Sequence, residues 1–122
     1  MGSNPVNLAI RFLLELGGLA AFAAIGWAQG AGMFRYLFAI GFPLAASVLW
    51  GTFAVPDDPS RSGTAVVAIP GFARLTLELI FFAAGTWAIF ALGATALAWA
   101  YGVIVLAHYA VSYDRIRWLV RQ

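Results

Sequence analysis

Two short segments of the chain place an arginine one helical turn before a glutamate, inside stretches that are otherwise apolar. RFLLEL begins at Arg11 and holds Glu15, and RLTLEL begins at Arg74 and holds Glu78. Side chains four residues apart are neighbours on one face of a helix, so each hexamer can hold an ion pair. A charge at the centre of a bilayer costs roughly 2.5–3.5 kcal/mol on insertion scales, so we expect the hexamers to neutralise each other. We therefore predict two crossed pairs, Arg11 with Glu78 and Arg74 with Glu15.

The Arg/Glu quartet is compatible with three kinds of chemistry. It can be a structural clamp that fixes helix pairing, a site for a polar ligand, or a carboxylate that carries protons or cations. Because an arginine lies one turn from each glutamate, we expect both carboxylates to stay ionised. This expectation favours the clamp or the ligand site over the proton carrier.

Four further residues are expected at the same depth, in the cytoplasmic third of the membrane. His108 is interpreted as a hydrogen-bonded packing residue, with a quartet partner, a proton relay and a haem ligand as alternatives. The block Trp50-Gly51-Thr52-Phe53 is interpreted as a helix end, with a cavity lining as the alternative. The predicted polar cluster comprises Arg11, Glu15, Trp50, Thr52, Arg74, Glu78, His108 and Tyr109.

The composition excludes several classes of function. The absence of cysteine rules out disulfides, thiolate metal sites and cysteine nucleophiles. A net charge of +2 without lysine is too small for a nucleic-acid-binding surface. We find no nucleophile–base pair, no metal-ligand spacing and no phosphate-binding glycine loop, so we expect no enzyme, no cofactor and no metal.

The chain is expected to be all-α, a four-transmembrane-helix bundle in a single membrane domain of residues 1–122. It is 63% hydrophobic and 10% charged, with a mean hydropathy of +0.90. A membrane helix needs about 20 mostly apolar residues, and four segments meet this requirement. The predicted helices are residues 6–28, 33–55, 71–92 and 94–113, with a loop at 56–70 and a tail at 114–122. Gly26 and Gly30 form a small-xxx-small motif that can bring two helices close.

The arginines predict the orientation of the helices. Arg35 alone lies on one side of the predicted bundle, and Arg11, Arg61, Arg74, Arg115, Arg117 and Arg121 lie on the other. Cytoplasmic segments are enriched in arginine, so both termini are expected in the cytoplasm of a bacterium, with the helices in its inner membrane. The N-terminus has no signal-peptide pattern. The last three arginines are expected to contact anionic lipid headgroups. Asp57, Asp58 and Arg61 are expected to lie in a solvated loop.

The sequence contains a partial internal repeat with an offset of 63 residues, the distance from Arg11 to Arg74. At this offset Glu15 also falls on Glu78 and Gly30 on Gly93. We therefore expect two repeated helical hairpins related by a pseudo-two-fold axis along the membrane normal.

The order of NLAIRFLLELGGLAA, LWGTFAVPDDP and RLTLELIFFAAG resembles the YrdB-like family of small bacterial membrane proteins. The resemblance covers most of the chain. Its most specific residues are the two Arg/Glu pairs and the Trp50 block followed by Pro56. It implies a four-helix membrane protein of uncharacterised function.

The sequence thus predicts a small membrane binding or accessory protein. Its inner-leaflet cluster is expected to hold a lipid headgroup, a small polar molecule or a partner helix, so membrane lipids, a second copy or another membrane protein are the expected partners. The alternative is a small secondary transporter that uses Glu15 and Glu78. A haem-binding or enzymatic membrane protein is the third hypothesis.

Overall fold

The computed structural model describes residues 4–56, 58 and 67–122, and these residues are almost entirely helical. The all-α prediction is therefore confirmed. The elements are α1 (Pro5–Gln29), α2 (Met33–Thr52), β1 (Phe53–Ala54), β2 (Val67–Ala68), α3 (Gly71–Ala91), α4 (Thr95–Val111) and α5 (Tyr113–Val120).

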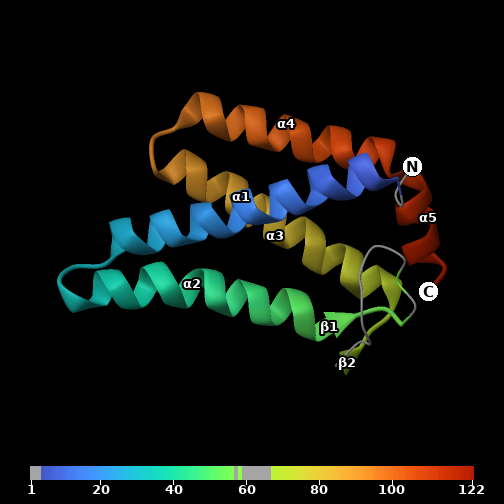
Figure 1. Ribbon diagram of the computed structural model, residues 1–122, viewed down its shortest axis with the longest axis horizontal. Helices are drawn as coiled ribbons and strands as arrows, with labels where there is room; N and C mark the ends of the chain where they lie inside the picture. Colours follow the sequence, from blue (N-terminus) through green and yellow to red (C-terminus); the bar gives the residue numbers. More distant parts are fainter. Residues whose placement is uncertain (1–3, 57, 59–66) are drawn as a thin grey trace.

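The four long helices run along the long axis of the molecule, and the short helix α5 crosses one end (Figure 1). Helix α1 packs against α2, α3 and α4, while α3 also packs against α4 and α5. Both termini lie at the end that carries α5 and the two short strands (Figure 1). The polar cluster lies toward this end of the molecule.

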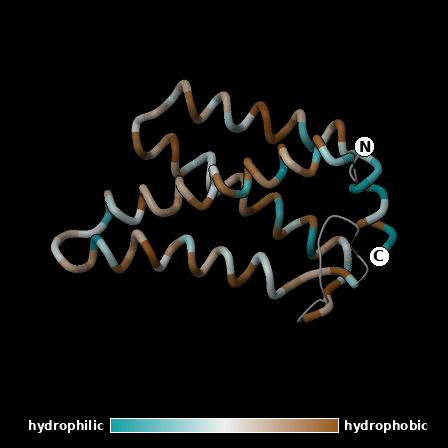
Figure 2. Tube along the Cα trace, viewed as in Figure 1, coloured by the Kyte–Doolittle hydropathy of each residue, from teal (hydrophilic) through white to brown (hydrophobic). Residues whose placement is uncertain are grey.

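Three of the described helices, α1, α2 and α3, are long and apolar enough to cross a membrane. Helix α4 has 17 residues and meets α5 at a bend of 68°, so it adds a fourth candidate only when the bent pair is taken as one span. Figure 2 shows hydrophobic residues along the helices and a concentration of hydrophilic residues near the two termini. This distribution is compatible with a membrane protein.

The helix ends differ most from the prediction after α2 and after α4, which ends at Val111 and not at residue 113. Helix α2 ends at Thr52, earlier than expected, because Phe53 and Ala54 become extended and pair in parallel with Val67 and Ala68. The predicted tail forms the helix α5. The expected loop positions of Asp57 and Arg61 lie outside the described residues.

The glycines of the first hairpin allow α1 and α2 to touch through their backbones. A Cβ atom at Gly26 would lie 2.3 Å from the carbonyl oxygen of Phe38, and one at Gly30 would lie 2.4 Å from Cα of Arg35. The intervening turn uses a positive φ of 59° at Gly32, which glycine adopts without a steric penalty. The small-xxx-small motif is therefore a place of close backbone approach in this hairpin.

The apolar core lies between α1, α3 and α4 and is centred on aromatic side chains. The Phe81 ring stacks edge-on against Phe22 and Phe82, with centroids 5.3 and 5.2 Å apart. Helix α2 contributes no buried residue and adds the partly buried Trp50 at the edge. The apolar core thus ends at the polar cluster. The core covers the side of the cluster that is turned away from the two termini.

Candidate functional site

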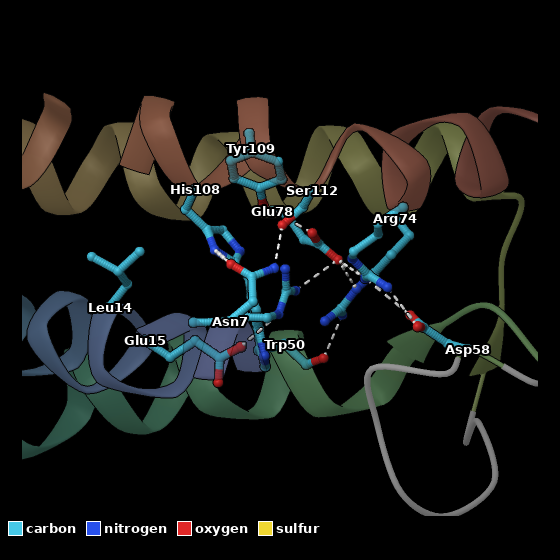
Figure 3. Close-up of polar contacts among 12 residues, drawn as sticks. Asn7, Leu14, Glu15, Trp50, Asp58, Arg74, Glu78, His108, Tyr109 and Ser112 are labelled. Carbon is cyan, nitrogen blue, oxygen red and sulfur yellow. Dashed lines mark hydrogen bonds and ion pairs between the residues drawn. The ribbon is translucent and has the colours of Figure 1, made fainter. Parts of the chain in front are cut away.

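A single carboxylate, that of Glu78 on α3, is the centre of the polar cluster. Its side chain is 0% exposed. Its Oε2 atom lies 3.0 Å from Arg11 Nη2, 2.9 Å from Arg74 Nε and 2.5 Å from Arg115 Nη2, and its Oε1 atom accepts a 2.9 Å hydrogen bond from Tyr109 (Figure 3). The predicted cross-helix pair of Arg11 and Glu78 is confirmed.

The second predicted cross-helix pair, Arg74 with Glu15, does not form. Arg74 uses its Nη1 atom for the carbonyl oxygens of Trp50 and Phe53, at 2.6 and 2.7 Å. The last carbonyls of a helix lack intrahelical donors and attract cations, so Arg74 caps the end of α2. Glu15 instead pairs with Arg11 on its own helix, at 3.3 Å, and its side chain stays 22% exposed.

Arg115 and Asp58 also belong to the cluster, although the sequence predicts a surface position for both. Arg115 Nη1 lies 2.5 Å from Asp58 Oδ1 and Nη2 lies 3.0 Å from Oδ2, with side chains only 4% and 1% exposed. Burial lowers the pKa of Arg115, but the hydrogen bonds and charges of Asp58 and Glu78 outweigh it, so the pKa lies above its ordinary value. The solvated loop expected at Asp58 and the lipid contact expected for Arg115 are therefore wrong.

Formal charge is balanced within this set of described residues. Three arginines, Arg11, Arg74 and Arg115, face three carboxylates, Asp58, Glu15 and Glu78. A buried charge is tolerated only when it is paired and hydrogen-bonded. Every charge of the cluster has an oppositely charged partner, whereas Arg11 Nη1 and Arg115 Nε have no hydrogen-bond partner among the described residues.

A neutral hydrogen-bonded chain adjoins the charges. His108 Nδ1 lies 3.0 Å from Asn7 Oδ1, and Asn7 Nδ2 donates a 2.6 Å bond to Ser112 Oγ. Since the Asn7 amide nitrogen donates to Ser112, its oxygen accepts from His108, which places the imidazole proton on Nδ1. His108 is 5% exposed and packs as a hydrogen-bonded residue. Its Nε2 atom is buried and has no hydrogen-bond partner in the described part of the chain.

Trp50 joins the charged cluster to the apolar core. Its ring lies 4.4 Å from Cζ of Arg74 and 5.4 Å from Cζ of Arg11, and 4.6 Å from the ring of Phe81. Thr52 is the last residue of α2, as expected for the helix end, and no hydrogen bond connects it to the cluster within the described ranges. The structure thus brings together every predicted cluster residue except Thr52.

Close contact between α3 and α5 positions Arg115. A Cβ atom at Gly71 would lie 1.6 Å from the carbonyl oxygen of Leu119, so only glycine fits there. Leu119 is 0% exposed and lies one turn after Arg115, on the same helix face. The four-residue spacing of Arg115 and Leu119 was the sequence signal for this buried face. No comparable signal marks Asp58.

The arrangement connects α1, α3, α5 and Asp58 through charged side chains. In the part of the chain that the structure describes, no group of three or more His, Cys, Asp or Glu residues is placed to hold a metal ion. Every carboxylate of the cluster has an arginine partner. Glu15 is the charged group of the cluster that is accessible from outside.

Comparison with known proteins gives a consistent family assignment. A family model described as "Protein of unknown function (DUF2568)" matches residues 9–106. The chain is 36% identical over 119 residues to "Uncharacterized protein YrdB" of Bacillus subtilis (strain 168). The aligned residues cover 98% of this chain and 97% of that protein. No solved structure matches.

Proposed function

Because the chain belongs to the YrdB-like family described as DUF2568, we propose that it is a small binding or accessory protein of the bacterial cytoplasmic membrane. The observation that carries this proposal is the environment of Glu78, whose Oε2 atom forms ion pairs with three arginines. A transported proton or cation would have to displace a guanidinium group from a side chain that is 0% exposed. Glu78 is therefore the permanently ionised centre of a clamp, and binding takes place at the accessible edge of the cluster.

The proposed topology has four spans, α1 to α4, with α5 along the cytoplasmic surface. Both termini lie at one end of the molecule (Figure 1), as an even number of spans requires. Helix α4 is about 25 Å long at 1.5 Å per residue, and the 68° bend turns α5 away from its axis. The arginine distribution supports cytoplasmic termini, since Arg35 lies at the opposite turn.

The proposed internal duplication gives α1 and α3 equivalent places in the bundle. Its support is that the two equivalent pairs within the helices both form, Arg11 with Glu15 at 3.3 Å and Arg74 with Glu78 at 2.9 Å. The two turns are not alike, because the positive φ falls on Gly32 in the first and on Gly93 in the second. The pseudo-two-fold axis thus relates the helices and not the details of the loops.

Transport measurements test the proposed function against its strongest rival, a proton-coupled exporter. The full chain is reconstituted into liposomes that contain a pH-sensitive dye, and a gradient of a hydrophobic cation is applied. We expect the same proton flux as in empty liposomes, for the wild type and for Glu15→Gln. A cation-driven proton flux that disappears in Glu15→Gln, while the melting temperature of the protein is unchanged, would show that it is a transporter.

A further inference from the structure

The accessible edge of the cluster is a carboxylate with unused hydrogen-bonding capacity. The Glu15 side chain is 22% exposed, whereas the other five charged side chains of the cluster are 5% exposed or less. Its one ion pair in the described structure is with Arg11, at 3.3 Å, and an ionised carboxylate can accept about four hydrogen bonds. In Figure 3 Glu15 lies at the edge of the cluster. A ligand that reaches the cluster here meets a negative charge.

An apolar crevice lies on the same side of α1. It has a volume of about 400 Å³ and lies between α1, α2 and α3. Its lining includes Phe22, Phe42, Ala46, Ala84, Trp87 and Ala88. Phe22 is seven residues after Glu15, so the two side chains share one face of α1, about 10 Å apart along the axis. The crevice therefore begins about two helical turns further into the membrane than the carboxylate.

The carboxylate and the crevice are connected through packed side chains. Glu15 pairs with Arg11, whose guanidinium lies 5.4 Å from the Trp50 ring. The Trp50 ring contacts Phe81, and Phe81 contacts Phe22 in the crevice wall. An amphiphile with a polar head at Glu15 and a chain pointing away from the cytoplasm would follow the face of α1 that carries Glu15, Leu19 and Phe22, whose side chains are partly exposed.

We propose that this surface holds an inner-leaflet phospholipid with a primary-ammonium headgroup, an ethanolamine phospholipid. Charge complementarity selects this class, because an ammonium N–H donates to the carboxylate of Glu15. The charges of the described cluster residues balance, so a zwitterionic headgroup leaves no excess charge, whereas an anionic headgroup without an ammonium brings a second negative charge to Glu15. A choline headgroup carries the same charge but has no N–H to donate. One acyl chain lies in the crevice.

This inference rests on the proposed function, since it takes Glu15 as a fixed binding group and not as a carrier. Native mass spectrometry of the full chain tests it. The protein is released from detergent with equal amounts of ethanolamine, choline and glycerol phospholipids of identical acyl chains. We expect about tenfold more of the ethanolamine lipid than of either other lipid to remain bound. This ratio corresponds to the free energy of one charge-assisted hydrogen bond.

Two pairs of variants test the contact with the lipid headgroup and the contact with the acyl chain separately. Glu15→Gln is expected to abolish the preference for ethanolamine, and Asp114→Asn, which removes an exposed carboxylate on α5, is expected to keep it. Ala84→Leu fills the crevice and is expected to reduce retention of all three lipids. Its control, Ala83→Leu, projects into the separate groove between α3 and α4 and is expected to leave retention unchanged. Melting temperatures confirm that each variant is folded.

Three results would overturn the inference. Equal retention of ethanolamine and choline lipids removes the role of the ammonium N–H. Tighter retention of dodecylammonium than of the ethanolamine lipid assigns the site to soluble amphiphilic cations. A dimer that persists without lipid and is lost in Ala84→Leu assigns the crevice to a second copy of the chain. Each of these can occur in a protein that transports nothing, so they leave the proposed function standing.

Discussion

Arg11 Nη2 lies 3.0 Å from Glu78 Oε2, which joins the first and third helices through two side chains that are 5% and 0% exposed. Arg74 and Arg115 approach the same oxygen atom. Three guanidinium groups around one carboxylate oxygen repel each other, so their proximity depends on the negative charge of Glu78. The cluster is therefore a single electrostatic unit and not a set of independent ion pairs.

Neutralising Glu78 should accordingly destabilise the protein more than neutralising any other carboxylate. Glu78→Gln leaves three buried arginines without their shared partner, and breaking a buried pair costs about 3–5 kcal/mol. Glu15→Gln removes a partly exposed partner at 3.3 Å, and such pairs contribute about 0–1 kcal/mol. Thermal unfolding in detergent, followed by intrinsic tryptophan fluorescence, measures both.

The double variant Arg11→Gln with Glu78→Gln is the test of the direct pair. Part of the loss in melting temperature should be recovered, because one unpartnered cation is removed together with its anion. A double variant that is as unstable as the sum of the two single variants would contradict the pairing.

The helices and the Arg11–Glu78 pair were predictable from the sequence because they follow from periodicity. Apolar runs of membrane length give the helices, and two hexamers with the same spacing give two pairs of opposite charge. The prediction that Arg74 pairs with Glu15 depends on the assumption that the two halves of the chain are equivalent. That assumption fails at the cluster.

The reason for the failure is visible at the offset of 63 residues. Arg115 and Tyr109, which both contact Glu78, fall at this offset on Thr52 and Ala46. The first half of the chain therefore has no arginine or tyrosine at these two equivalent positions to contact Glu15, which stays at the edge. Asp58 could not have been predicted, because a loop has no periodicity from which to infer burial.

Docking of α5 should depend on Gly71. Any side chain at this position collides with the backbone of Leu119, where a Cβ atom would lie 1.6 Å from the carbonyl oxygen. Gly71→Ala should therefore move α5 and weaken the contact of Arg115 with Glu78, at a loss of about 2–4 kcal/mol. Gly41→Ala is the matched control, because a Cβ atom there meets nothing within 4 Å. The readouts are the melting temperature and the rate of proteolysis at the C-terminus, and equal behaviour of the two variants would refute the close contact.

The α1–α2 hairpin should depend on Gly26 in the same way. A Cβ atom at Gly26 would lie 2.3 Å from the Phe38 carbonyl oxygen, so Gly26→Val forces the two backbones apart. We expect a lower melting temperature by several degrees, with Gly41→Val as the helical control. Gly26→Val at wild-type stability would mean that the helices do not touch at this point.

The four-span topology can be measured directly because the chain contains no cysteine. Single cysteines at Ser3 and Gln122 should react with a membrane-impermeant maleimide only after the cytoplasmic side is opened. Single cysteines at Ala31 and Ala94, in the two turns at the opposite end, should react in intact cells. If α4 did not cross the membrane, Ala94 and Gln122 would be labelled from the same side. Labelling of Ser3 and Gln122 from opposite sides would exclude an even number of spans. It would also exclude a polar cluster that both halves of the chain form in the same leaflet.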